Sequence, residues 1–442
     1  MREMKDSGVE WIGKIPKDWL LERGKYIFLQ RNQRGNKDNL QLLSPTQKYG
    51  VIPQLLYDEL SGMNAVKLNE KVDLSLMKTI HNGDYCISLR SFQGGFEYSK
   101  YEGVVSPAYQ VFYPQIMISD GYYKYLFKDS SFIEKMNSFT MSLRDGKNIA
   151  YSDFSNSYIP YPPVSIQKSI ANYLDYRCSE IDSLSADIQK QIDILNQYKQ
   201  SVITETVTKG LDKNAEMKDS GVKWIGKMPK SWSTNKIKYL FRNNKGLSIT
   251  KENLIDNGLP VLSYGQIHSK NNTGVFISDD LLRYVNYEYQ SKYPQCQVYK
   301  NDFIFADTSE DYEGCGNCVY KRDNSILFAG YHSIILQTIQ KQDNRYFAYL
   351  FKTDCWRKQI REVASGVKLF SISQKSLTNA SVIAPPLVEQ LQISDFLDAK
   401  CSVIYSSISD KQKQLDNLAE YKKSLIYEYV TGKKEVPTAN GK

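Results

Sequence analysis

The chain has 442 residues, enough for two or three domains with separate hydrophobic cores. It lacks an apolar run of the roughly 18 residues that a membrane helix needs, and Met1 to Trp19 holds no signal-peptide core. Seven scattered cysteines suit free thiols better than a disulfide framework. We therefore expect a soluble cytoplasmic protein. A net charge of +8 is compatible with a polyanionic partner, and 33 tyrosines indicate either a binding surface or a codon-usage bias.

One segment near the start of the chain returns almost unchanged in its middle. Met4 to Trp19 reads MKDSGVEWIGKIPKDW, and Met217 to Trp232 reads MKDSGVKWIGKMPKSW. Two widely separated copies indicate a duplicated half-molecule and exclude a short-period solenoid. The spacing from Gly8 to Lys14 imitates a phosphate-binding loop, but the internal Trp and the Pro that follows exclude one. The tryptophans of each copy are predicted to pin an extended arm onto a neighbouring surface.

Each arm is followed by a segment of mixed pattern, 20–157 and 233–380. In the first, apolar runs at 40–43, 85–89 and 109–113 predict strands, and residues 121–139 predict one helix. The second follows the same plan, with residues 42–44, 83–87 and 125–128 corresponding to 261–263, 301–305 and 349–352, and 106–109 to 329–332. Because the loops between these segments differ, one scaffold is expected to present two different recognition surfaces.

The periodicity then changes to that of long helices. Pro162-Pro163 and Pro385-Pro386 each start a helix of about 45 residues, roughly 65 Å, with an apolar residue every seven positions. The two helices are predicted to pack as an antiparallel coiled coil that acts as a spacer. The main seam consists of Leu174, Ile181, Ile188, Leu195 and Val202 in one helix and of Leu397, Ile404, Leu418 and Leu425 in the other.

Smaller features complete the predicted coiled coil. Cys178, Leu184, Ile192 and Tyr198 are expected to form the second seam of the first helix. Lys411 stands where the first helix has Ile188, which marks either a register device or a drift from the strict heptad. By symmetry, the first arm should dock near the end of the helix containing Cys401, and the second near the end of the helix containing Cys178.

The sequence shows none of the common catalytic motifs. Neither Pro-Pro pair has the acid or amide before it and the aromatic after it that an amino-methyltransferase loop needs, and a glycine-rich cofactor turn is missing. Cys315 and Cys318 form the one close cysteine pair, for which an ordinary turn is favoured over structural zinc. No catalytic residue and no metal ligand is therefore assigned, and His332 is interpreted as a core or DNA-facing polar residue.

Polar loops remain as candidates for binding DNA, because Arg, Lys, Asn, Gln and Tyr side chains contact base edges and phosphates. Each such loop taken alone is more often solvated surface, but the loops recur at matching places in both halves. The candidates in the first half are Arg31, Arg34, Lys48, Tyr49, Arg90, Gln93, Arg144, Lys147 and Asn148. Those in the second half are Arg242, Lys245, Gln266, His268, Lys270, Lys321 and Lys368.

The duplicated arm W-I-G-x-x-P-x-x-W, the variable segment and the helix start P-P-x-x-x-Q-x-x-I-x-x-x-L-D together resemble the specificity subunit of type I restriction-modification systems, over essentially the whole chain. The resemblance implies an α+β fold with two pseudo-symmetric target recognition domains separated by two long helices. The expected parts are an arm (1–19), recognition domain 1 (20–157), helix 1 (158–211), a linker with the second arm (212–232), recognition domain 2 (233–380), helix 2 (381–434) and a tail (435–442).

The resemblance also implies a function. A non-catalytic, sequence-specific subunit would read a bipartite, asymmetric target in double-stranded DNA and direct adenine methylation or cleavage by its partners. These would be two modification subunits and the restriction or translocase subunits, which would hold S-adenosylmethionine, ATP and Mg while this chain binds no cofactor. Two rivals remain, a self-contained DNA-modifying enzyme and a structural adaptor that binds only proteins.

Overall fold

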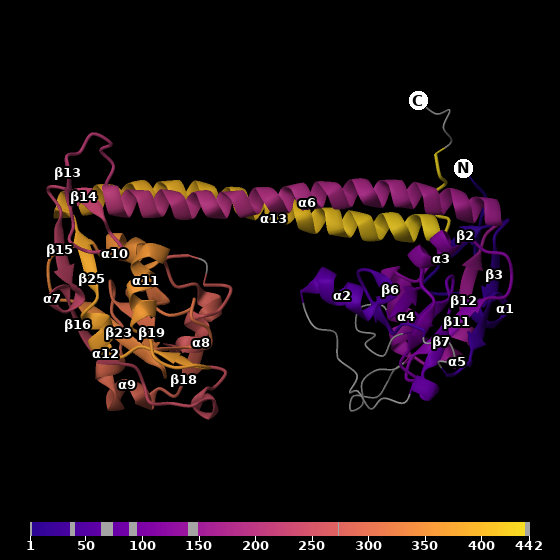
Figure 1. The fold of residues 1–442 in the computed structure, drawn as a ribbon, viewed down its shortest axis with the longest axis horizontal. Helices are drawn as coiled ribbons and strands as arrows, with labels where there is room; N and C mark the ends of the chain where they lie inside the picture. Colours follow the sequence, from indigo (N-terminus) through magenta and orange to yellow (C-terminus); the bar gives the residue numbers. More distant parts are fainter. Residues whose placement is uncertain are drawn as a thin grey trace. The chain divides into compact units, whose positions relative to one another are not determined.

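The structure is a computed structural model that describes residues 2–35, 40–62, 74–87, 95–139, 149–272 and 274–437. The chain divides into two compact units. Unit 1 comprises residues 1–189 and 412–442, and unit 2 comprises residues 190–411. Each unit contains one globular domain together with part of each of two long helices, α6 (Val164–Lys209) and α13 (Leu387–Val430) (Figure 1).

The repeated arm is a small β-hairpin in both units. Its first copy pairs β1 (Met4–Asp6) with β2 (Lys14–Pro16), and its second pairs β13 (Met217–Asp219) with β14 (Lys227–Pro229), both antiparallel. The carboxylates of Asp6 and Asp219 each accept a hydrogen bond, 2.9 Å long, from the backbone N–H two residues further on. The glycines that donate these bonds have φ values of 66° and 69°, which explains the retained Asp-Ser-Gly.

Both domains are built on a four-stranded antiparallel sheet of the same order. In unit 1 the order is β4-β11-β8-β9, and in unit 2 it is β16-β23-β19-β21. The shared order confirms that residues 83–87 correspond to 301–305, because β8 and β19 hold the same place in the two sheets. The unit 1 strands are β4 (Phe28–Arg31), β8 (Tyr85–Ile87), β9 (Phe96–Tyr98) and β11 (Gln110–Pro114), and the unit 2 strands are β16 (Phe241–Lys245), β19 (Phe303–Ala306), β21 (Cys318–Tyr320) and β23 (Ser333–Thr338).

Shorter elements surround each sheet. Unit 1 has β3 (Leu20–Arg23), α1 (Gly24–Ile27), β5 (Leu43–Thr46), β6 (Gly50–Pro53), α2 (Gln54–Ser61), β7 (Lys78–Ile80), β10 (Gly103–Val105), α3 (Asp120–Leu126), α4 (Ser130–Ser138), α5 (Tyr151–Asn156) and β12 (Tyr158–Tyr161). Unit 2 has β15 (Ser233–Lys236), α7 (Ile237–Leu240), β17 (Leu259–Leu262), α8 (Tyr264–Ile267), β18 (Arg283–Val285), α9 (Glu288–Lys292), β20 (Thr308–Ser309), β22 (Phe328–Ala329), α10 (Asn344–Phe351), α11 (Asp354–Glu362), β24 (Phe370–Ser371), α12 (Gln374–Thr378) and β25 (Ser381–Ala384). In both units, the strand after the arm pairs with the strand that precedes a long helix.

The helix predicted over residues 121–139 is wrong in one respect, because the structure has two helices there. The first, α3, ends at Leu126, and Asp129 caps the second, α4, since its carboxylate accepts hydrogen bonds from the backbone N–H groups of Ser131 and Phe132. The apolar periodicity continued across this break and concealed it.

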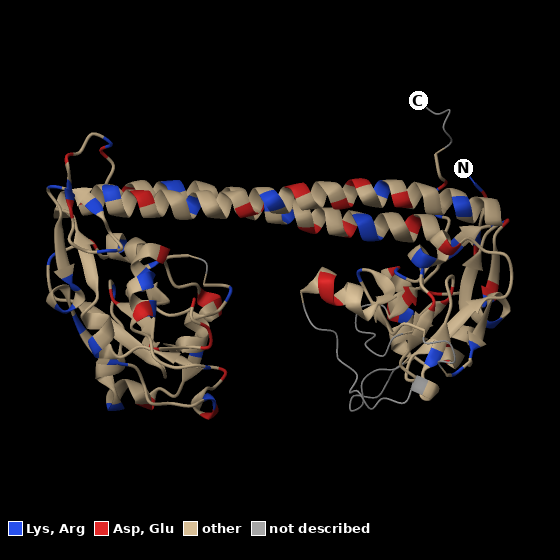
Figure 2. Cartoon of the chain, in the orientation of Figure 1, with Lys and Arg blue, Asp and Glu red and all other residues tan. Residues whose placement is uncertain are grey.

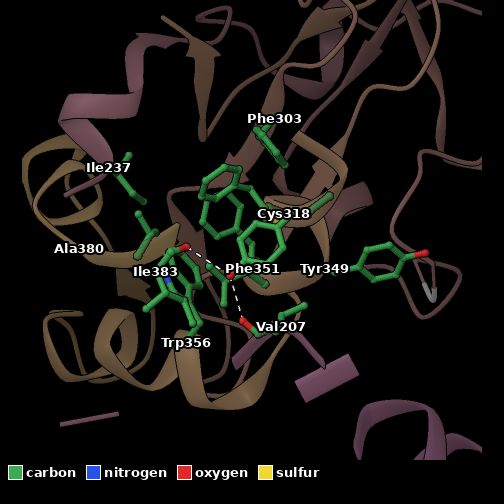
Figure 3. Close-up of a cluster of buried hydrophobic side chains, with 14 of the residues drawn as sticks. Val207, Ile237, Phe303, Cys318, Tyr349, Phe351, Trp356, Ala380 and Ile383 are labelled. Carbon is green, nitrogen blue, oxygen red and sulfur yellow. Dashed lines mark hydrogen bonds between the residues drawn. The ribbon is translucent and has the colours of Figure 1, made fainter. Parts of the chain in front are cut away.

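Aromatic side chains form the core of each domain. In unit 2 the rings of Phe351 and Trp356 lie 4.5 Å apart and those of Phe303 and Phe351 5.1 Å apart, beneath the sheet (Figure 3). In unit 1 the ring of Phe28 meets Phe112 at 5.4 Å and Tyr123 at 5.2 Å. Burial of such rings contributes most of the apolar surface that holds a domain of this size together.

A glutamine fastens the start of each long helix to the domain before it. Gln167 donates through Nε2 to the carbonyl of Pro162 (2.8 Å) and accepts through Oε1 from the backbone N–H of Ser119 (2.8 Å). Gln390 does the same with Pro385 (2.8 Å) and Asp343 (2.9 Å). The repeated Pro-Pro-x-x-x-Gln is therefore both a helix start, as predicted, and a connection to the domain.

Two tyrosines on the helix after each sheet complete this attachment. In unit 1, the Tyr122 hydroxyl donates to the carbonyl of Val430, near the end of α13 (2.6 Å), and that of Tyr125 donates to Asp175 (2.8 Å). In unit 2, Tyr346 donates to the carbonyls of Val207 (2.9 Å) and Ile383 (3.3 Å), as Figure 3 shows, and Tyr349 to Asp398 (2.7 Å). Each domain is thus attached to the start of one long helix and to the end of the other.

The two long helices pack antiparallel within each unit. In unit 1, Tyr173 contacts Tyr429 and Asp182 pairs with Lys422. In unit 2, Lys411 binds Gln191 and the amine of Lys199 lies 4.3 Å from the ring of Tyr405. In both cases the number in α13 falls as the number in α6 rises, as an antiparallel pair requires.

The main seam is confirmed, and the second seam needs a correction. Leu174, Ile181, Ile188, Leu397, Ile404 and Leu425 are buried, and Leu195, Val202 and Leu418 are half-buried. Cys178 and Ile192 of the second seam are buried, but Leu184 and Tyr198 are 49% and 46% exposed. Because seam positions alternate in steps of four and three, Ser185 and Lys199 stand there instead. The Lys199 side chain is buried, which lowers the pKa of its amine.

The repeated arm docks where the symmetry predicts. In unit 1, Lys433 donates to the carbonyl of Ile12 (2.8 Å) just after α13 ends, and Gly432 lies against Pro16 and Trp19. In unit 2, Gly210, just after α6 ends, lies against Pro229 and Trp232. The two glycines have φ values of 71° and 79°, which other residues rarely adopt, so both positions favour glycine. A Cβ on Gly432 would also collide with Pro16 and Trp19.

We predict that Trp11→Ala lowers the free energy of unfolding by about 3 kcal/mol, because the ring is 9% exposed and lies edge-on to Phe132 at 5.6 Å. Trp224→Ala, at the matching place in unit 2, should cost less, because that ring is only partly buried. Denaturant unfolding of the full chain would measure both, with Tyr287→Ala (64% exposed) as a control expected to change stability by less than about 0.5 kcal/mol. An equal cost for the two tryptophans would contradict the difference in their burial.

Candidate nucleic-acid interface

Four loops of unit 2 meet and form a surface that we call the recognition face. They are residues 263–272 after β17, 307–317 after β19, 330–332 after β22, and 365–371 around the start of β24. The short strands β20 and β24 pair antiparallel, Thr308 opposite Ser371, and bring the second and fourth loops together. Loops far apart in the sequence therefore share one surface.

His268 connects two of these loops. Its Nε2 donates to the carbonyl of Thr308 (2.8 Å), because a carbonyl can only accept. Its Nδ1 lies 3.0 Å from the side-chain amide of Asn317, which donates. His268 is therefore a half-buried ring that fixes the first loop against the second, and its position makes it a support for the face.

His332 is the more exposed histidine, with 55% of its side chain accessible. Its φ of 52° lies in the left-handed region, which is uncommon for a residue other than glycine. Both of its polar contacts use Nδ1, at 3.1 Å from the Thr308 hydroxyl and 3.2 Å from the Asp307 carboxylate. A proton relay through the ring would need a partner on each nitrogen, and both contacts use the same one. Nε2 takes no part in them and remains available to a ligand. The ring of Tyr264 packs edge-on against it at 5.4 Å.

Residues 365–371 form a hairpin with an apolar and basic tip. Ser365 and Ser371 exchange backbone hydrogen bonds of 3.0 and 2.8 Å, and Gly366 turns the chain with a φ of 127°. Val367 at the tip is 93% exposed, and Lys368 beside it is also exposed. Such a tip can offer an ammonium to a phosphate and a branched apolar group to a base edge.

Acidic residues of the second loop are held by arginines. Arg361 contacts the carboxylate of Glu313 at 3.0 Å and that of Asp354 at 2.6 Å, and Arg357 donates to the carbonyl of Cys315 at 3.4 Å. Burial lowers the pKa of Arg357, and the positive charge of Arg361 lowers it further. Lys and Arg are interspersed with Asp and Glu over both domains and along both helices (Figure 2).

The other candidates of unit 2 lie in different settings. Arg242 in β16 donates to Gln337 (2.8 Å), and Gln266 accepts from the backbone N–H of Ser263 (3.1 Å) in a capping box. Lys321 is 4% exposed and binds Asp323 (2.7 Å), which lowers the pKa of that carboxyl. Lys245 and Lys270 are exposed. Of the predicted set, the recognition face brings together Gln266, His268, Lys270 and Lys368.

In unit 1 the structure describes four of the candidates. Arg31 makes a two-point ion pair with the buried carboxylate of Asp84 (2.7 and 3.0 Å), and its guanidinium lies 4.4 Å from the ring of Tyr113. Arg34 is exposed, and its backbone forms an isolated antiparallel β-bridge with Lys78 in β7. Lys48 and Tyr49 lie on the turn between β5 and β6. Arg90, Gln93, Arg144, Lys147 and Asn148 lie outside the described residues.

Lys48 and Tyr49 border a cavity of about 560 Å³ within unit 1, between its domain and the long helices. Glu97 lies in its wall, 2% exposed, and pairs with Lys128. Burial raises the pKa of Glu97 to about 7, although Lys128 opposes the shift. The cavity therefore has a carboxyl group that changes charge near neutral pH.

Neither a metal site nor a membrane span is found in the described ranges. No group of three or more His, Cys, Asp or Glu there could hold a metal ion. Cys315 and Cys318 are buried, and burial raises the pKa of both thiols, that of Cys318 to about 11. Nor is any described helix long and apolar enough to cross a bilayer.

Sequence reasoning missed Asp307, Thr308, Tyr312 and Val367 as parts of the face. Thr308 and Asp307 reach His332 only through the pairing of β19 with β23. Tyr312 reaches the hairpin by packing at 5.6 Å from Phe370. The sequence carries no local signal for these contacts. The Ser-Gly-Val-Lys-Leu run does have the composition of an exposed turn, and it could have marked Val367.

The structure thus has two matching α+β domains and two long antiparallel helices, with loops that differ on a common scaffold. The chain matches the sequence model of the type I restriction modification DNA specificity domain twice, over residues 13–193 and 229–417. It therefore belongs to this family, whose members are the non-catalytic specificity components of type I systems.

Individual relatives agree with this assignment. The type I restriction enzyme MjaVIII specificity subunit of Methanocaldococcus jannaschii is 27% identical over 314 residues, 69% of this chain and 69% of that protein. The EcoKI specificity subunit of Escherichia coli K12 is 23% identical over 318 residues, 70% of this chain and 64% of that protein. A chain in a solved type I restriction-modification system, studied for its assembly and conformational transition, has the same fold, with a TM-score of 0.70, 13% identity, and coverage of 95% of this chain and 99% of that one.

We predict that the free energy of unfolding falls as the pH rises from about 4.5 to about 7, because the folded chain holds the Glu97 proton more tightly than the unfolded chain does. Glu97→Gln should remove this contribution, which amounts to at most about 3 kcal/mol. Urea unfolding of both proteins at pH 5 and 7.5 would measure it, with the exposed Glu59→Gln as control. An unchanged pH slope in Glu97→Gln would contradict the assignment.

Proposed function

We propose that this chain reads a bipartite, asymmetric target in double-stranded DNA, each domain contacting one half-site. The observation that carries the proposal is the combination of an identical sheet order in the two domains with different loops at the corresponding edge. One example is Ser106-Pro-Ala-Tyr109 in unit 1 against Ala329-Gly-Tyr-His332 in unit 2. Two half-sites multiply the specificity of two modest interfaces, since a good base contact discriminates by about 1–3 kcal/mol.

The recognition face supplies suitable chemistry for the second half-site. Nε2 of His332 and the amine of Lys368 can meet base edges or phosphates, and the methyl groups of Val367 can meet a thymine methyl. The supports behind them, His268 and Asp307, hold the loops before DNA arrives. Such preorganisation reduces the ordering cost of binding.

The long helices would set the unread gap between the half-sites. α6 has 46 residues and α13 has 44, so each extends over roughly 65–70 Å. The hydrogen bonds from the domains to the helix starts and ends favour a spacer that transmits its length to the two domains. Because the two helices support each other, the gap should depend on both.

The chemistry would come from partner subunits. Two modification subunits would carry S-adenosylmethionine and methylate adenine, and restriction subunits would use ATP and Mg for translocation and cleavage. This chain would bind no cofactor of its own and would work in the cytoplasm, where the DNA is. Methyl transfer by the isolated chain would favour the self-contained enzyme, and a complex without sequence preference would favour the protein-binding adaptor.

We predict that Lys368→Ala and His332→Ala each weaken binding to the target by about five- to tenfold, through the second half-site alone. Single-molecule sequencing of methylated adenines would define the target, and fluorescence anisotropy on duplexes with one half-site scrambled would measure the effect. Scrambling the second half-site should abolish the difference between variant and wild type. Lys292→Ala is the control, since that lysine is ion-paired with Glu288 on α9, outside the recognition face. Loss of affinity through the first half-site would contradict the assignment.

We further predict that inserting four residues after Gln189 in α6 and four after Gln412 in α13 lengthens the unread gap by one or two base pairs. The insertions add about 6 Å of helix, and base pairs stack every 3.4 Å or so. Sequencing of methylated adenines would report the new gap. A four-residue insertion after Lys213, in the loop between α6 and β13, serves as control and should leave the gap unchanged. An unchanged gap after the paired insertion would show that the helices do not set the spacing.

A further inference from the structure

One exposed feature is retained in both halves without a structural reason. The short helix after the first strand of each domain carries Lys25-Tyr26 in unit 1 and Lys238-Tyr239 in unit 2. The two tyrosines are each 57% exposed, and each lies 5.4 Å from the amine of its neighbouring lysine. The turn thus presents the same exposed pair twice, and in unit 2 the amine of Lys238 also donates to the side chain of Asn379 (3.0 Å).

The flanking residues show what packing explains and what it does not. The next two positions, Ile27-Phe28 and Leu240-Phe241, are buried in the two cores and are kept similar for that reason. Exposed neighbours have changed: Leu20 (54% exposed) corresponds to Ser233, and Leu29 (46% exposed) to Arg242. Exposed positions in this region therefore drift, while the Lys-Tyr pair does not.

The backbone of the turn is held in place in both units. In unit 1 the side-chain amide of Gln115 donates to the carbonyl of Lys25 (2.5 Å). In unit 2 that of Gln340 donates to the carbonyl of Tyr239 (2.7 Å). An isoleucine next to each glutamine, Ile116 or Ile339, is 38% or 53% exposed. Each unit thus has a fixed surface of one lysine, one tyrosine and one isoleucine, which we call the Lys-Tyr surface.

Tyr198 and Tyr421 are also repeated, and each is 46% exposed, but their retention has a structural cause. Lys400 of the other helix lies 5.5 Å from the ring of Tyr198, and Arg177 hydrogen-bonds Tyr421, so both pairs connect α6 to α13. Among the described residues, neither Lys-Tyr turn connects α6 to α13, and the amine of Lys238 donates within its own domain, to Asn379 at the end of α12.

We infer that the two Lys-Tyr surfaces are equivalent docking sites for two copies of one protein subunit. This inference rests on the proposed function, in which two modification subunits bind the chain. A partner present twice needs the same contacts on both units, whereas two half-sites of different sequence do not. An exposed Tyr with an adjacent Ile and one cation suits a protein surface that offers an apolar pocket beside a carboxylate, because Tyr is enriched where proteins bind each other.

The position of the surface also favours protein over DNA. In unit 2, α7, which carries Lys238-Tyr239, lies at the opposite side of the domain from α8 and its recognition loop (Figure 1). The helix that carries the Lys-Tyr surface in unit 2 thus lies away from the helix that begins the first recognition loop. The two isoleucines stand at different positions, because Gln115 and Ile339 bond the matching carbonyls of Ile27 and Leu240. The part of the surface that is retained position by position is therefore the Lys-Tyr pair.

Native mass spectrometry of the full chain mixed with the modification subunit of its own system tests the inference. Wild type should bind two copies. Tyr26→Ala and Tyr239→Ala should each weaken one of the two binding steps about tenfold, and the double variant should weaken both. Lys25→Glu with Lys238→Glu should act in the same direction without removing any buried group, and Tyr287→Ala is the exposed control.

The outcomes separate the two proposals. If wild type binds no modification subunit, the proposed function and this inference both fall. If wild type and the double variant bind two copies with equal affinity, the Lys-Tyr surface is not the docking site, and the proposed function stands. If the double variant keeps its partner but loses affinity for DNA as an isolated chain, the surface contacts nucleic acid and the inference is overturned.

Discussion

The arrangement of each unit depends on the hydrogen bond between a buried tyrosine hydroxyl and the last turn of a long helix. The carbonyls at a helix end have no partner within the helix, and a buried hydroxyl without a partner costs free energy. Tyr122 and Val430 in unit 1, and Tyr346 and Val207 in unit 2, satisfy each other. With the glutamine at the start of the other helix, this bond fixes how each domain sits on its two helix segments. The loops of a domain consequently have a defined direction relative to the helices of their own unit.

The seam between the helices shows how duplication has been followed by specialisation. Lys199 and Lys422 occupy the same position of the repeat, yet the first lies against the ring of Tyr405 and the second pairs with Asp182. Burial lowers the pKa of Lys199, so its charge is carried at a cost that the tyrosine ring partly offsets. A polar group at a seam position restricts which register the helices can adopt, because a slipped register would bury it without a partner. The seam therefore specifies alignment as well as affinity.

Much of this architecture could be predicted from the sequence, because it depends on periodicity and repetition. The two proline pairs, the heptads from Leu174 and Leu397, and the docking of the arms follow from patterns that survive in one dimension. The prediction that Leu184 and Tyr198 lie in the second seam of α6 is wrong, because it follows their apolar character. The heptad, with its alternating steps of four and three residues, places Ser185 and Lys199 there. The candidate DNA-binding residues were only partly predictable. Lys368 and Lys270 do lie on exposed loops of the recognition face. Arg31 and Lys321 lie outside it and have carboxylate partners that no local pattern reveals. Contacts such as Thr308 with His332 depend on strand pairing over long sequence separations, which local propensity does not encode.

A duplicated chain contains a comparison that a single domain lacks. Buried residues that match between the halves, such as Trp19 and Trp232, are explained by packing, since a core tolerates few alternatives. Exposed residues that differ, such as those of 106–109 and 329–332, are expected where each half contacts something different. Exposed residues that match are explained by neither cause, unless a contact such as that of Tyr198 with Lys400 accounts for them. Tyr26 on α1 and Tyr239 on α7 are matching exposed residues of this third kind, and this is the reason for assigning them a partner that is itself present twice.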